Sequence, residues 1–229
     1  MAGRKEIRPA GPCGTSDTAG DRSAQAAAAV QGLRKLYPDA HCELDHKTPL
    51  ELLVATILSA QCTDQRVNLV TKTLFRKYRT AQDYARAKTA ELEGLVRSTG
   101  FFRSKAKSIR ETAKILAAKH GGKVPDTMEE LLQLRGVARK TANVILGTAF
   151  GQASGIVVDT HMKRLAFRLG LTDETEPVAV EKDLMALVPK KDWIFFSQGM
   201  VWHGRRVCFA RHPDCPGCAL NTVCPKRGV

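Results

Sequence analysis

The chain of 229 residues carries 36 lysines and arginines against 23 aspartates and glutamates, a formal net charge of +13. Its 43% hydrophobic residues suffice for a sizeable core, but no apolar run approaches the roughly 20 residues of a membrane span, so we expect no membrane partner. A basic folded chain favours a polyanionic partner, most commonly nucleic acid, although a basic protein without such a partner remains the alternative.

The first 22 residues are rich in glycine, proline, serine, threonine and basic side chains and contain little that could be buried. This composition predicts a disordered basic tail without the apolar segment of a secretory signal. Ser23 can cap a helix that runs to Leu36 and ends before Pro38.

Apolar side chains at helical spacing predict further helices, several of them opened by capping residues. Thr48 to Glu51 is a capping box with proline at the first helical position, and Asp126 to Glu129 is a second box. Besides two helices flanking Gly136, we expect helices over 52–60, 64–78, 81–87, 90–96, 102–119, 160–169, 178–187 and 191–207. Because no segment alternates as a strand does, the predicted fold class is all-α with about ten helices.

The stretch 131–162 contains a tight glycine turn, Gly136-Val137-Ala138, directly before a helix that opens with Arg139 and Lys140. Amides at a helix N-terminus can bind a phosphate without reading base sequence. A glycine turn between helices is by itself more often plain topology. With Arg135, Arg139 and Lys140 beside it, binding of a DNA backbone becomes the better interpretation.

Asp159 follows Lys140 by nineteen residues, after an apolar run and before Thr160 and His161. Lys140 alone reads as a surface lysine, and Asp159 alone reads as a helix N-cap. Together they can form a nucleophile and a carboxylate that stabilises positive charge, and the capping role can coexist with this one. We expect His161 to be a structural, hydrogen-bonding histidine.

Four of the seven cysteines lie in the last 22 residues at spacing C-x6-C-x2-C-x5-C, namely Cys208, Cys215, Cys218 and Cys224. This distribution favours a metal site in a reducing compartment. A single C-x2-C flanked by single cysteines suits a [4Fe-4S] cluster, with zinc, disulfides or free thiols as alternatives. We expect a structural cluster that shapes the Cys208–Cys215 loop so that Arg211 meets a phosphate, within positive surroundings supplied also by Arg205, Arg206, Lys226 and Arg227.

Three motifs in order resemble the endonuclease III family of helix-hairpin-helix DNA glycosylases. They are LRGVARKTAN at 134–143, VDTH at 158–161 and the four cysteines. The segments LSAQ at 58–61 and GFFRSKA at 100–106 are similar to two further family segments. The resemblance covers about residues 25–229. This chain departs from the pattern at Arg135, where proline is usual, at Ala138, where a second glycine is usual, and in the 151–155 segment, which looks one residue longer.

The resemblance implies an iron–sulfur-containing base-excision-repair enzyme that removes oxidised pyrimidines from duplex DNA. Lys140 would attack C1′ of the damaged nucleotide, form a Schiff base and cut the strand by β-elimination, assisted by Asp159. The nucleotide must first flip out of the duplex. Gln61 would fill the vacancy and Phe101 or Phe102 would wedge between bases, although either aromatic could instead pack in the core.

The fold implied is two helical lobes with a DNA-binding cleft between them. We expect a helical barrel over 43–152, with the helix-hairpin-helix at about 127–150, and a cluster lobe formed by 23–42 and 153–229. The expected partner is damaged double-stranded DNA, bound by a monomer in a bacterial-type cytoplasm at the nucleoid. The alternatives are a monofunctional mismatch or adenine glycosylase of the same superfamily, against which Lys140 argues, and a non-catalytic DNA-binding module.

Overall fold

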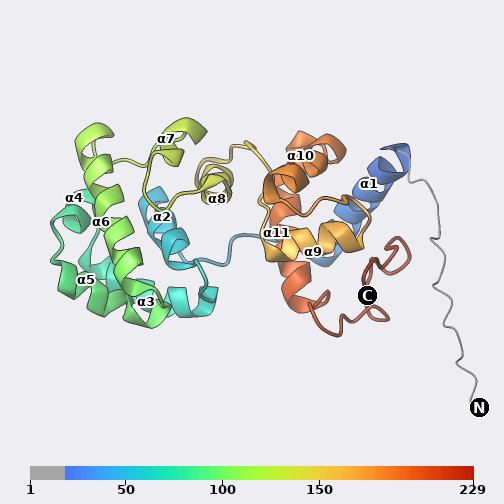
Figure 1. Cartoon of the computed structure of the whole chain (residues 1–229), viewed down its shortest axis with the longest axis horizontal. Coiled ribbons are helices and arrows are strands. Elements are labelled where there is room, and N and C mark those ends of the chain that lie inside the picture. Colours follow the sequence, from blue (N-terminus) through green and yellow to red (C-terminus); the bar gives the residue numbers. More distant parts are fainter. Residues whose placement is uncertain (1–18) are drawn as a thin grey trace, which may run out of the picture.

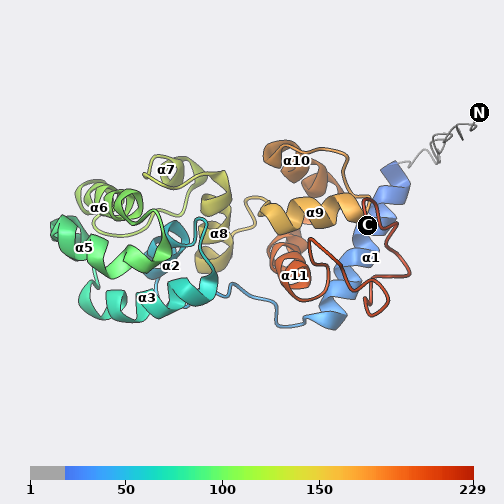
Figure 2. The same ribbon diagram turned by 60° about the horizontal axis from the view of Figure 1, so that its bottom comes forward.

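The computed structural model describes residues 19–229, and every regular element in this range is a helix. The predicted all-α class is therefore confirmed. Figures 1 and 2 show two groups of helices connected by two crossings of the chain, one between α1 and α2 and one between α8 and α9. Most of the predicted tail lies outside the described residues. None of the helices between residues 19 and 229 combines the length and apolarity that a bilayer span requires.

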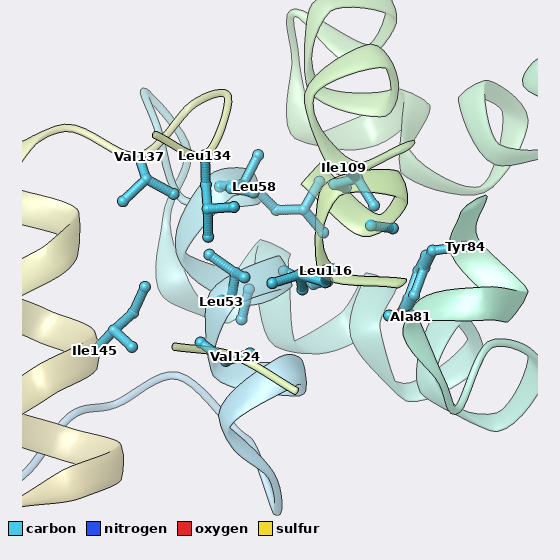
Figure 3. Close-up of a cluster of buried hydrophobic side chains, with 14 of the residues drawn as sticks. Leu53, Leu58, Ala81, Tyr84, Ile109, Leu116, Val124, Leu134, Val137 and Ile145 are labelled. Atoms are coloured by element: carbon cyan, nitrogen blue, oxygen red, sulfur yellow. The ribbon is translucent and has the colours of Figure 1, made fainter. Parts of the chain in front are cut away.

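The first lobe contains the helices in the middle of the chain. These are α2 (Pro49–Leu58), α3 (Asp64–Lys77), α4 (Ala81–Arg86), α5 (Thr89–Val96), η1 (Arg97–Thr99), α6 (Phe102–Lys119), α7 (Met128–Leu132) and α8 (Arg139–Phe150). Figure 3 shows side chains from α2, α6 and α8 converging in its core, among them Leu53, Leu116 and Ile145, which are fully buried. Each such side chain contributes about 1.5–3 kcal/mol through burial.

The second lobe combines the first helix with the C-terminal part of the chain. It consists of α1 (Ala19–Leu36), α9 (Thr160–Arg168), α10 (Pro177–Leu187), η2 (Lys190–Asp192), α11 (Trp193–Arg206) and the irregular segment 207–229 (Figure 1). Its core includes Leu33, Leu165 and Phe196. The separation into two cores supports the predicted lobe boundaries, which themselves stay a prediction.

Local hydrogen bonds explain where several helices begin. Thr48 Oγ1 accepts the amide of Glu51 at 3.2 Å at the start of α2, as predicted. The Glu51 carboxylate accepts the amide of Lys47, one residue before the N-cap. In a complete capping box it would accept the amide of Thr48 itself, so the predicted box differs in this second bond. Thr80 and Asp83 form a complete capping box at α4. These short-range bonds satisfy amides that the helix cannot pair itself.

Two predicted helix starts were wrong. The first helix begins at Ala19, so Ser23 lies inside it and does not cap it; Arg22 pairs with Asp173 in the second lobe and supports the extra turn. The helix α7 is capped by Thr127, which accepts the amide of Glu130, and not by Asp126. Both errors arise because several residues near each start can serve as a cap.

Candidate active site

The turn between α7 and α8 has the backbone of a tight hairpin. Gly136 has φ +82°, a left-handed conformation that favours glycine, and a Cβ there would lie 3.2 Å from Cβ of Ser108. Ala138 is the N-cap of α8 with φ −94° and ψ 172°. Because any residue adopts this extended conformation, alanine at this position leaves the hairpin intact. Val137 is buried in the first core and anchors the turn.

The two arginines beside the hairpin are engaged in ion pairs. Arg135 lies 3.0 Å from Glu111 on α6. Arg139 donates two hydrogen bonds to Glu181 on α10. Direct phosphate contacts of either guanidinium therefore stay a prediction. The amides of the first turn of α8, which no side chain of residues 19–229 caps, are the part of the hairpin best suited to a phosphate.

Lys140 and Asp159 come from different lobes and line one hollow between them. Lys140 is exposed on the first turn of α8. Oδ1 of Asp159 accepts the amide of Met162 at 2.7 Å, which confirms its expected place as the N-cap of α9. The cap fixes the carboxylate where it lines the hollow. An amine and a fixed carboxylate thus face the same space, as covalent catalysis with charge stabilisation requires.

Gln61 lines a second hollow, together with His161. It is exposed in the loop between α2 and α3 and has φ +52°. Glu43, Asp64 and Arg205 line both hollows, so the two share a wall between the lobes. The structure thereby brings Gln61 to the same cleft as Lys140 and Asp159.

Ion pairs that the sequence did not indicate lie at this shared wall. Arg205 of α11 donates to Asp64 of α3 at 2.8 Å and also to Glu43. Arg206 donates to the other oxygen of Glu43 at 2.9 Å. Both arginines were expected to surround the cysteines with positive charge, but their charge is paired at the cleft. No local pattern indicates these pairs, because their members lie more than 140 residues apart in the sequence.

His161 has the hydrogen-bonding surroundings expected of a structural histidine. Its Nδ1 lies 3.1 Å from Nη2 of Arg164. Arg164 also donates to the carbonyl oxygens of Gly204 at 3.0 Å and Cys208 at 2.9 Å. These bonds attach the first turns of α9 to the end of α11.

The two adjacent phenylalanines are in different environments. Phe101 is 67% exposed and has φ +46°, directly before α6. Phe102 packs against the first core, with the guanidinium of Arg103 5.4 Å from its ring centroid. The buried ammonium of Lys105, whose pKa is lowered by burial, donates to the carbonyl of Thr99 at 2.6 Å and holds the Phe101 loop. Phe101 is therefore the side chain available to enter a duplex.

Replacing Phe101 with alanine should weaken binding to lesion-containing duplex roughly 5- to 150-fold, because stacking on a base is worth about 1–3 kcal/mol. The free energy of unfolding should change by less than about 0.5 kcal/mol, since the ring is exposed. Phe102→Ala should instead cost about 1–3 kcal/mol of stability. Fluorescence anisotropy and urea unfolding measure the two effects. Normal lesion binding by Phe101→Ala would contradict the assignment.

The four C-terminal cysteines line a common cavity that also includes Leu165, Leu220 and His203. Burial raises the pKa of the Cys218 thiol, and the charges of Cys208, Cys224 and Cys215 raise it further, which places all four sulfurs within Coulombic reach. In the described part of the chain no three potential ligands stand close enough to hold a single metal ion. The structure thus brings the four thiols predicted as metal ligands to the lining of one cavity.

Arg168 organises the loop that begins at Cys208. It is buried, lies 3.3 Å from the Cys208 sulfur, and donates to the carbonyls of Phe209 at 2.7 Å and Ala210 at 3.1 Å. Arg211 follows on this loop and is exposed. The loop thus presents Arg211 to solvent, as its predicted phosphate contact requires.

Comparison with known proteins identifies the class that this fold and site define. Residues 54–190 match the model of the HhH-GPD superfamily base excision DNA repair proteins. The chain is 45% identical to the protein in the structure of a trapped endonuclease III–DNA covalent intermediate, covering 89% of this chain and 96% of that one with a TM-score of 0.85. A thermostable thymine-DNA glycosylase has the same fold at 21% identity and a TM-score of 0.78.

Curated relatives narrow the class further. Endonuclease III of Synechocystis sp. is 55% identical over 193 residues, covering 84% of this chain and 88% of the relative. Endonuclease III of Bacillus subtilis is 46% identical over 190 residues, covering 82% and 86%. The chain belongs to the endonuclease III family and is a base-excision-repair DNA glycosylase with AP lyase activity. The predicted DNA glycosylase with AP lyase activity is therefore confirmed, in preference to a monofunctional glycosylase or a non-catalytic DNA-binding module.

Proposed function

We propose that the chain removes oxidised pyrimidines from duplex DNA, with Lys140 as the nucleophile and Asp159 as its carboxylate partner. The observation that carries this proposal is the hollow between the lobes, which both residues line although they come from different lobes. Family membership supports the same assignment, because a trapped covalent intermediate is described for a similar endonuclease III.

In the first step the neutral amine of Lys140 attacks C1′ of the flipped nucleotide, and the damaged base leaves with the electrons of the glycosidic bond and is protonated. The Asp159 carboxylate stabilises the positive charge that develops on the sugar. Ring opening and loss of a proton from nitrogen give the Schiff base. Removal of the 2′ proton then expels the 3′ phosphate, which cuts the strand, and water releases the lysine.

Groups around the hollow are suited to bind a duplex from which one nucleotide has flipped out. The uncapped amides of α8 would hold a phosphate beside Lys140. Gln61, exposed at the cleft, would occupy the space that the flipped nucleotide leaves, and Phe101 would separate the neighbouring bases.

Borohydride trapping tests the lyase chemistry, and a lesion panel tests the substrate class. Duplexes that contain thymine glycol, adenine opposite 8-oxoguanine, a thymine–guanine mismatch or no lesion are scored separately for base release and strand cleavage. We expect the thymine glycol duplex to be processed fastest. Preferred release of the mispaired adenine or thymine would overturn the substrate assignment.

We also propose that Cys208, Cys215, Cys218 and Cys224 hold a [4Fe-4S] cluster. The support comes from the cavity that all four thiols line and from their spacing in the sequence. When bound, the cluster would cross-link the loop and leave the chemistry to other residues. The presence of both lobes in one chain supports a monomer, and the bacterial relatives together with a DNA substrate support a place at the nucleoid.

The purified protein should be brown and contain about four iron atoms and four sulfides per chain. Cys218→Ser should lose most of the iron, because a cubane needs all four corner ligands, whereas Cys62→Ser, outside the set, should keep it. Metal analysis by mass spectrometry together with a sulfide assay measures this. A colourless protein with one equivalent of zinc would show that the cluster assignment is wrong.

A further inference from the structure

Glu181 on α10 is a buried carboxylate at the centre of a hydrogen-bond network. Its side chain is 6% exposed. Arg139 Nε donates to Oε2 at 2.7 Å and Nη2 donates to Oε1 at 3.2 Å, while Asn143 Nδ2 donates to Oε1 at 2.8 Å. Ser154 Oγ donates to Oδ1 of Asn143 at 3.1 Å. The hydrogen bonds to Glu181 raise the pKa of Arg139. Both carboxylate oxygens are thus satisfied, as a buried charge requires.

This network joins the two lobes at the helix that carries Lys140. Arg139 and Asn143 lie one turn apart on α8, which belongs to the first lobe through buried side chains such as Ile145. Glu181 lies on α10, which packs in the second core through Leu184. Paired hydrogen bonds between a guanidinium and a carboxylate fix direction as well as distance. The network therefore links α8 to the second lobe with a defined direction.

The same network supports the segment that leads to Asp159. A Cβ at Gly155 would lie 2.1 Å from Oε1 of Glu181 and 2.7 Å from Nδ2 of Asn143. The backbone at Gly155 therefore packs directly against these two side chains. Two residues later the amide of Val157 donates to Ser197 Oγ at 3.0 Å. The buried segment 155–158 is held at both points before it reaches Asp159.

We propose that Glu181 is a positioning residue that sets the separation of Lys140 and Asp159. The inference rests on the proposed function of these two residues. The network begins one residue before Lys140 and contacts the chain four residues before Asp159. A displacement of about 1 Å between reacting groups can lower a rate 10²-fold. Because the Glu181 network holds the backbone next to both Lys140 and Asp159, its loss should slow the chemical step.

The ion pair of Arg139 and Glu181 could instead contribute only to the stability of the fold. A second ion pair of similar burial provides the control for this alternative. Arg34 pairs with Asp192, and their side chains are 50% and 11% exposed, against 43% and 6% for Arg139 and Glu181. Both members of this second pair lie in the second lobe. Asp192→Asn therefore removes a comparable buried charge without loosening the lobes.

The experiment compares wild type, Glu181→Gln and Asp192→Asn in single-turnover borohydride trapping on thymine glycol duplex, where the base must leave, at saturating protein. The dissociation constant for DNA and the melting temperature are measured in parallel. Glu181→Gln should slow adduct formation roughly 10- to 100-fold with DNA affinity little changed. Asp192→Asn should trap at the wild-type rate even where its melting temperature falls.

A folded Glu181→Gln variant that traps at the wild-type rate would overturn the proposal. If that variant does not fold, the double variant Arg139→Gln/Glu181→Gln, which leaves no unpaired charge, is measured by the same criterion and is expected to be slow. A wild-type protein that binds the thymine glycol duplex but forms no adduct would overturn the proposed function, and this inference with it. If the wild-type protein forms the adduct and Glu181→Gln forms it at the same rate, only the positioning role of Glu181 is rejected, and the proposed function stands.

Discussion

Lys140→Gln should abolish the covalent adduct with abasic or thymine glycol duplex and reduce strand cleavage roughly 10³-fold or more. The physical reason is that an amide nitrogen cannot form a Schiff base. The side chain is exposed, so the free energy of unfolding should change by less than about 0.5 kcal/mol. Gel analysis of borohydride-trapped complexes measures the adduct, and DNA affinity is measured on the same duplex.

Lys163→Gln is the matched control, because Lys163 lies on the first turn of α9 beside Asp159 but belongs to neither hollow. It should trap at the wild-type rate when protein is saturating. A covalent adduct formed by Lys140→Gln, or lost in Lys163→Gln, would show that another amine is the nucleophile.

Asp159→Asn should lower the rate of base removal about 10²- to 10³-fold while leaving the melting temperature nearly unchanged. Asparagine caps a helix about as well as aspartate, so the hydrogen bond to the amide of Met162 survives while the charge is lost. Asp159→Ala loses both and should in addition cost about 1 kcal/mol of stability. Single-turnover kinetics and thermal unfolding separate the two roles.

Thr80→Ala provides the control for cap loss, because Thr80 caps α4, which lies at the end of the first lobe away from the second lobe (Figure 1). It should cost a similar amount of stability without slowing base removal. If Asp159→Asn were fully active, the carboxylate would be only a helix cap, and the proposed charge stabilisation would have to come from another group.

Much of the helical framework could be predicted because its signals are local. The helix α6 has its predicted bounds, and Gly121 and Gly122 end it with positive φ angles. Thr48 and Asp159 cap the helices predicted for them. A cap involves residues two or three apart, so it is visible in the sequence. The predicted start of α1 at Ser23 was wrong, because the ion pair between Arg22 and the distant Asp173 supports an earlier start.

Exposure could not be predicted in the same way. Phe101 and Phe102 are adjacent, and nothing in their order distinguishes the exposed ring from the packed one. The left-handed backbone at Phe101 and the buried ammonium of Lys105 decide the question. Likewise, the sequence predicts that Arg139 adds positive charge beside the hairpin, but its guanidinium is paired with Glu181, 42 residues away.

By itself the sequence determined the helical class and the hairpin, and it predicted the metal site and the Lys140–Asp159 pair, because each is a pattern of residue types at short or characteristic intervals. Only the tertiary structure decided which surfaces face the cleft. It brought Gln61 to that cleft and joined the lobes through Glu181 and Arg205. The physical reason is that a charge pair across two lobes depends on how their cores pack, and no local periodicity records that packing.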